Sequence, residues 1–208
     1  MDYQHMLNFV NDYLERHNAI RSKKPKFCFR NRFEHTKRVY KWANILLSDY
    51  PNCNKDVVLV SAIFHDVGYA FGQKDHAIKS AEIFMEYAKD NNLDLELSQM
   101  IYENILVHSN KHLLDDKDIS PELIILLEAD LLDEEGALGI AFDLLSEGFK
   151  CPDNYQSGIE SITMHSAHIF NQNFMVSPTA KKIWSKKQEL VRMFLEEYKN
   201  DLFIEEDN

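Results

Sequence analysis

The chain has 208 residues, 45% of them hydrophobic and 12% aromatic, which is enough for a packed globular domain and argues against disorder or a fibrous repeat. With 23 Lys and Arg against 34 Asp and Glu, the formal net charge is −11. This balance disfavours broad binding to a nucleic-acid polymer or an anionic membrane. Only 6 Gly and 5 Pro are present, too few for the frequent turns of a sandwich or barrel. We therefore expect an all-α fold.

Apolar residues recur three or four positions apart in nearly every segment of the chain, as expected for helices packed through one face. The predicted helices cover 2–18, 32–49, 55–70, 75–90, 95–109, 120–133, 136–147, 155–174 and 178–201. The segment 55–70 is apolar on most sides, so a buried strand is the alternative there, although its length favours a helix. No repeat or linker divides the sequence, which predicts one domain over 1–201 and an acidic tail at 202–208.

The cysteines and the apolar runs indicate a cellular location. Cys28, Cys53 and Cys151 are far apart, which favours neither a disulfide framework nor a thiolate zinc site and fits a reducing compartment. The amino-terminal segment lacks the apolar core of a secretory signal, and no apolar run approaches the roughly 18 residues of a membrane span. We expect a cytoplasmic protein without a membrane partner.

Several histidines and aspartates lie on apolar helix faces. His35 shares a stripe with Val39, Trp42 and Leu46, so it points inward. The pair His65-Asp66 ends the most hydrophobic segment of the chain, where burying an unpaired carboxylate would cost several kcal/mol.

A second carboxylate projects toward the same interior, because Asp130 shares a face with Leu123 and Leu127. Two buried carboxylates repel one another unless they share a proton or bind a cation. The inward imidazoles of His35 and His65 favour the cation. Two His and two Asp suit a divalent ion, for which Mn, Fe, Co, Ni, Mg and Zn are the candidates. His108 also points inward, at the end of a stripe of apolar residues.

The order of these residues resembles the H…HD…D signature of the HD-domain metal-dependent phosphohydrolases, an all-helical superfamily. The segment EHTKRVYKWA is similar to the family's H-x-x-R-V-x-x-x-A helix, and FHDVGYA to the end of its HD helix. EADLLDEEGALGIAF resembles the D-A-D-x-L-D-x-x-G-A-x-G-I-A stretch of one bacterial branch, whose further histidine segments are similar to DHAIKSAEIF and ILVHSN. The resemblance is strong over 32–145 and implies a compact HD-type bundle with additional C-terminal helices.

The resemblance implies a ligand set and a mechanism. One ion would be held by His35, His65, Asp66 and Asp130. A second ion would be held by His76 and His108 and bridged by Asp66, with helix capping as the alternative for His76. Open coordination positions would leave room for substrate and for a water whose lowered pKa supplies the nucleophile, so Asp66 also counts as catalytic.

Basic residues are concentrated between 21 and 41, where nine of the 23 lie and Glu34 is the only acid. We hypothesise that this segment attracts a small phosphorylated substrate, although a solvated connector is the alternative. Arg38, one turn from His35, and its neighbour Lys37 are the candidate substrate-binding residues. Replacing Arg38 with Ala should raise KM for a phosphate ester and leave the metal content unchanged.

Two further acids are candidates for proton transfer. Asp133 lies one turn after Asp130, where it would carry a proton, orient a ligand histidine, or cap a backbone group. Glu82 lies in the helix that follows His76 and is the second candidate acid or base.

Together these features favour an enzyme that hydrolyses a phosphoester or phosphoanhydride of a small molecule, for which we favour a nucleotide. Two alternative functions would use the same histidine and aspartate ligands. One is a regulatory module that binds metal and nucleotide without turnover. The other is a diiron oxygenase, because some relatives of the family use an iron pair for oxidative cleavage.

Overall fold

The structure is a computed structural model that describes residues 1–170 and 172–203. Within these ranges the fold is all-α, as predicted, and contains no β-sheet beyond an isolated antiparallel bridge between Arg21 and Asn31. Its helices are α1 (Tyr3–Arg16), α2 (Arg32–Leu46), α3 (Lys55–Phe64), α4 (His76–Asp90), α5 (Leu95–Val107), α6 (Pro121–Asp133), α7 (Ala137–Lys150), α8 (Gln156–His165) and α9 (Pro178–Asp201). Among the described residues, none of these helices is both long and apolar enough to cross a bilayer.

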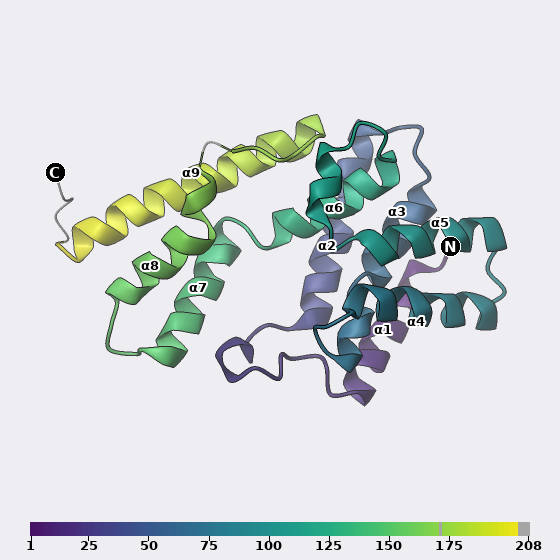
Figure 1. The fold of residues 1–208 in the computed structure, drawn as a ribbon, viewed down its shortest axis with the longest axis horizontal. Helices are drawn as coiled ribbons and strands as arrows, with labels where there is room; N and C mark the ends of the chain where they lie inside the picture. Colours follow the sequence, from purple (N-terminus) through teal and green to yellow (C-terminus); the bar gives the residue numbers. More distant parts are fainter. Residues whose placement is uncertain (171, 204–208) are drawn as a thin grey trace.

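Helix α3 is the centre of the larger part of the molecule, where it contacts α1, α2, α5 and α6 (Figure 1). Asn54 caps its start by accepting hydrogen bonds from the N–H groups of Asp56 and Val57. Every residue from 57 to 64 is buried, because neighbouring helices cover all sides of α3. The apolar segment is therefore a central helix and not a strand. It ends at Phe64, and a short 3₁₀ helix over Val67–Phe71 follows the His65-Asp66 pair.

Helices α7, α8 and α9 form a smaller part beside this bundle (Figure 1). Ile140, Ile159, Ile162, Val191 and Leu195 form its own apolar cluster. Helix α9 also packs on α6, and this contact joins the smaller part to the larger bundle.

The prediction of one helix over 155–174 is wrong, because α8 ends at His165 and only a 3₁₀ turn over Ala167–Ile169 follows. Beyond this turn, side chains of other helices form hydrogen bonds with several backbone N–H and carbonyl groups. The Trp184 indole donates to the carbonyl of Gln172, and the N–H groups of Val176 and Ser177 donate to the Glu128 carboxylate. These backbone groups are therefore hydrogen-bonded without a helix. Of the predicted acidic tail, residues 204–208 lie outside the described residues.

Gly68 permits a close approach between the 3₁₀ helix and the start of α4. A Cβ atom on Gly68 would lie 2.1 Å from the carbonyl oxygen of His76 and 2.5 Å from the amide nitrogen of Ser80. The Gly68 N–H instead donates to Ser80 Oγ at 2.8 Å. This contact brings His76, the first residue of α4, next to Asp66.

Candidate metal centre

The six predicted ligands converge from five separate segments of the chain. They are His35 on α2, His65 and Asp66 after α3, His76 at the start of α4, His108 at the end of α5, and Asp130 on α6. Nε2 of His35 lies 3.2 Å from Oδ1 of Asp130, 3.5 Å from Oδ2 of Asp66 and 3.1 Å from Nε2 of His65. Oδ1 of Asp66 lies 3.5 Å from Nε2 of both His76 and His108.

Three overlapping triads within this cluster have ligand atoms that all lie within 4.8 Å of one another. They are His35, His65 and Asp66; His65, His108 and Asp130; and Asp66, His76 and His108. Asp66 belongs to the first and the third triad, with its two oxygens facing different histidines. A cluster of imidazoles and carboxylates at this spacing fits a divalent ion, and its extent fits two.

Three of the histidines are oriented in the same way. Nδ1 of His65 lies 2.9 Å from the carbonyl of Ala62, that of His76 3.0 Å from the carbonyl of Gln73, and that of His108 2.7 Å from the carbonyl of Ile105. A carbonyl only accepts, so each Nδ1 carries the proton, and the lone pair of Nε2 is directed into the cluster. This is the tautomer that a metal ligand needs.

His35 is oriented by a carboxylate instead. Its Nδ1 lies 2.8 Å from Oδ2 of Asp133, which is 2% exposed and receives two hydrogen bonds from Arg38, at 2.7 and 2.9 Å. Burial alone would lower the pKa of His35, but the hydrogen bonds that its ring donates to Asp130 and Asp133 raise the pKa to about 10. The structure thus places Asp133 behind a candidate ligand, while a part in proton transfer stays a prediction.

Two cations contact the candidate ligand carboxylates, and the sequence did not predict these contacts. Arg32 Nη1 lies 2.9 Å from Oδ2 of Asp66, and Lys111 Nζ contacts Oδ2 of Asp130. Burial alone would raise the pKa of both carboxyl groups, yet each pKa lies well below the usual range. The pKa of Asp66 is lowered by His65, His108 and Arg32, and that of Asp130 by Lys111 and His35. Both carboxylates are therefore held as anions, the form that binds a metal.

The other candidate residues lie further out. Lys37 pairs with Glu34 at 2.6 Å, and Glu82 pairs with Lys79 at 2.7 Å on exposed surface. Neither has a hydrogen bond or ion pair to the metal cluster among the contacts described. Their substrate-binding and catalytic roles stay predictions.

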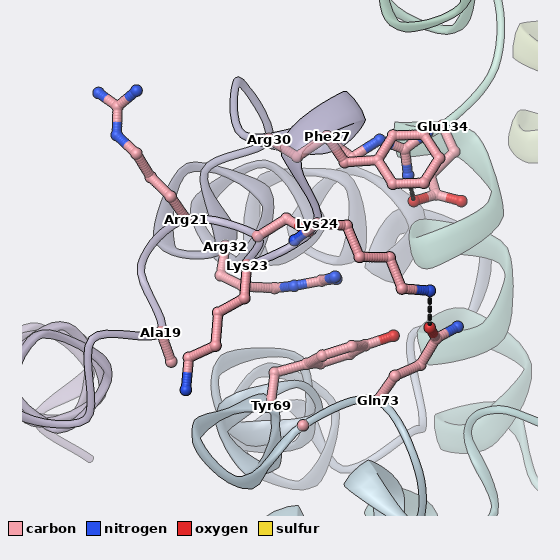
Figure 2. A pocket seen from close by; sticks show the side chains of 12 residues that line it. Ala19, Arg21, Lys23, Lys24, Phe27, Arg30, Arg32, Tyr69, Gln73 and Glu134 are labelled. Carbon is pink, nitrogen blue, oxygen red and sulfur yellow. Dashed lines mark hydrogen bonds and ion pairs between the residues drawn. The ribbon is translucent and has the colours of Figure 1, made fainter. Parts of the chain in front are cut away.

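The basic segment lines a cavity of about 340 Å³ beside the cluster. Arg21, Lys23, Lys24, Arg30 and Arg32 contribute to its wall. Figure 2 shows the Arg32 side chain extending over the face of the Tyr69 ring, and the guanidinium carbon lies 3.5 Å from the ring centroid. Because Arg32 also contacts Asp66, this basic cavity adjoins the metal centre.

The comparisons with known proteins agree with this geometry. The family model described as HD domain matches residues 32–135, the segment that supplies all six candidate ligands. No curated protein matches the sequence significantly.

Solved structures resemble the fold along almost the whole chain. An HD-superfamily hydrolase from Bacillus thuringiensis is 18% identical with a TM-score of 0.72, and the match covers 98% of this chain and 97% of that one. The Lin1889 protein from Listeria innocua is 19% identical with a TM-score of 0.67, covering 99% and 100%. Bacillus subtilis YpgQ in complex with ADP is 19% identical with a TM-score of 0.65, covering 96% and 94%. With the family model spanning half of its length, the chain belongs to the HD-domain family.

Proposed function

We propose that the protein is a metal-dependent phosphohydrolase that cleaves a phosphoester or phosphoanhydride bond of a small molecule, with a nucleotide as the favoured substrate. The observation that carries this proposal is the position of Asp66. Its carboxylate contacts histidines of the two triads to which it belongs, and it also contacts Arg32 in the wall of the basic cavity. The relatives support it, since the Bacillus thuringiensis protein is an HD-superfamily hydrolase and the Bacillus subtilis YpgQ structure contains ADP.

The residues fit a divalent ion, because every histidine of the cluster has its Nδ1 engaged and its Nε2 facing the others. His35, His65, Asp66 and Asp130 would hold the first ion, and His76 and His108 would hold the second together with Asp66. A bound divalent ion supplies Lewis acidity and lowers the pKa of water toward neutrality.

The chain's own residues position the substrate and the ligands. Arg21, Lys23 and Lys24 provide positive charge along the basic cavity, where phosphate oxygens of a substrate would accept hydrogen bonds. Arg32 stands between this cavity and Asp66, so it would fix the distance between a bound phosphate and the metal ligands. Asp133 and Arg38 hold the His35 ring.

The test combines elemental analysis with a screen of nucleotides and generic phosphate esters in the presence of Mn²⁺, Mg²⁺, Co²⁺ or Ni²⁺. We expect metal-dependent release of phosphate or pyrophosphate. Replacing Asp66 with Asn should lower the rate at least about a hundredfold, because the carboxylate shared by both triads loses its charge. Circular dichroism should show retained helix, and the exposed Asp90→Asn on α4 is the matched control.

Other outcomes would assign a different function. Nucleotide binding without turnover under every metal condition would contradict the proposal and favour a regulatory module. Product formation that requires dioxygen would contradict it in favour of an oxygenase.

A further inference from the structure

A second cavity, of about 320 Å³, lies next to the basic cavity. The two share Phe27, Arg30 and Glu134 in their walls. Arg30, Glu134 and Phe142 of the second cavity also line a recess of about 20 Å³ that reaches His35. The second cavity is therefore connected through common residues to both the basic cavity and the metal centre.

Carboxyl groups give this cavity a chemistry unlike that of its neighbour. Its wall contains Glu134, Glu135 and Asp143, of which Glu135 is 6% and Asp143 8% exposed. Oε1 of Glu135 is buried and has no hydrogen-bond partner among the described residues. Burial raises the pKa of all three carboxyl groups. Glu134 accepts from Arg30 at 3.3 Å, and Asp143 contacts His165 at 2.8 Å. The unpaired, desolvated acceptor is therefore Oε1 of Glu135, which a ligand that donates an N–H group would stabilise.

Aromatic rings supply the rest of the wall. Phe27, Phe142 and Trp184 line the cavity, and the Arg30 guanidinium lies 5.1 Å from the ring centroid of Phe27 and 4.6 Å from that of Phe142. Nε of Arg30 is also buried, and it has no hydrogen-bond partner in the part of the chain that the structure describes. Lys26 is part of the wall as well, with its ammonium 4.5 Å from the Phe27 ring centroid. Ring faces and a planar guanidinium favour a flat, polarizable ligand.

We infer that this second cavity is a subsite for the base of the substrate, and that it selects a planar heterocycle carrying an exocyclic amino group. The inference rests on the proposed function, because it assumes phosphates in the basic cavity and at the metal centre. A carboxyl oxygen of Glu135 accepts a hydrogen bond from an exocyclic amine. An oxo group at the same place would put two hydrogen-bond acceptors opposite each other. Amino-bearing bases are therefore preferred to bases that carry only oxo groups.

The enzymatic test uses pairs of substrates that differ at this group, CTP against UTP and GTP against ITP. We expect kcat/KM to favour the amino-bearing partner by about tenfold, the effect of one added hydrogen bond to a buried acceptor. Glu135→Gln should reduce that ratio toward one, because the amide can rotate to accept from an amine or to donate to an oxo group. Glu160→Gln on the exposed face of α8 is the matched control and should keep the wild-type ratio. Equal kcat/KM within both wild-type pairs would overturn the inference.

A binding measurement separates this inference from the proposed function. Nucleosides have no phosphate to hydrolyse, so calorimetric titration of the purified protein with cytidine and with uridine reports on the base subsite alone. We expect cytidine to bind about tenfold more tightly than uridine in the wild type, and Glu135→Gln to remove the difference. Equal affinities would overturn the subsite even if phosphate esters are hydrolysed. Turnover of inorganic tripolyphosphate, which has no base, tests the hydrolase function independently.

Discussion

Two pairs of carboxyl groups lie within a short stretch of chain, yet their surroundings differ. Asp130 and Asp133, on α6, are held by Lys111, His35 and Arg38, and their pKa values lie below the usual range in spite of burial. Glu134 and Glu135 follow directly, and desolvation raises their pKa values by more than Arg30, Ser166 and Lys187 lower them. The ionisable group is a carboxyl in both pairs, so its neighbours decide whether it is held as an anion that suits a cation or kept closer to its neutral form.

The contrast follows from the way the two parts of the molecule meet. Helix α6 faces α2 and the cations of the larger bundle, whereas the turn after it faces the aromatic side chains of α7 and Trp184 on α9. The candidate ligand carboxylates and the cations that pair with them thus lie on the α2–α6 side, and the adjoining cavity offers the Glu135 acceptor within a wall that contains aromatic rings.

The largest expected effect on the α6 side comes from Asp133→Asn. The amide cannot accept with a full charge from His35 Nδ1, and it also loses the ion pair with Arg38. We expect metal affinity to fall about 10- to 100-fold, as is usual when a group that orients a ligand histidine is removed. Competition with a metal chelator measures this, with Asp90→Asn as control. Affinity within twofold of the wild type would show that Asp133 does not position His35.

Arg38→Ala should have a smaller effect, about threefold to tenfold on metal affinity, because Asp133 keeps its bond to His35 but loses the two hydrogen bonds that fix it. This expectation differs from the one drawn from the sequence, where Arg38 was assigned to the substrate. Measuring KM and metal affinity in the same variant decides between the two. A raised KM with unchanged metal affinity would support phosphate binding by Arg38.

The smallest effect concerns stability on the other side of the comparison. The pKa of Glu135 is raised in the folded state, so its neutral form stabilises the fold below the unfolded pKa of about 4.3, and this contribution is lost as pH rises through the folded pKa. Glu135→Gln cannot ionise, so its Tm should exceed that of the wild type by about 2–4 °C at pH 7 and by almost nothing at pH 4. Calorimetry at both pH values measures the difference. A lower Tm of the variant at pH 7 would mean that a donor stabilises the ionised carboxylate.

The residues of the candidate ligand cluster could be predicted from the sequence, because helical periodicity indicates which face of a helix is buried. His35, His108 and Asp130 end or interrupt apolar stripes, and the HD resemblance supplied the order that links them. The structure brings these residues together with His65, Asp66 and His76, and the family match covers all of them.

The ion pairs around the cluster could not be predicted in this way. The pairing of Arg32 with Asp66 and of Lys111 with Asp130 depends on how the loops before α2 and after α5 fold back, which periodicity does not describe. The helical stripe of Ile162, His165 and Ile169 predicts that His165 lines the core, but its side chain is 60% exposed and pairs with Asp143 at 2.8 Å. The second cavity likewise forms only where α6, α7 and α9 meet, so no single segment predicts it.

Gly68 affects how many ions the candidate metal centre could hold. The hydrogen atom in place of a side chain allows the backbone to bring the start of α4 against Asp66, and with it the imidazole of His76. The added carbon of an alanine would collide with backbone atoms of α4 and force that helix outward, away from the carboxylate that both ions would share. Binding of a second ion, as proposed above, would thus depend on the absence of one methyl group, at a position that coordinates nothing itself.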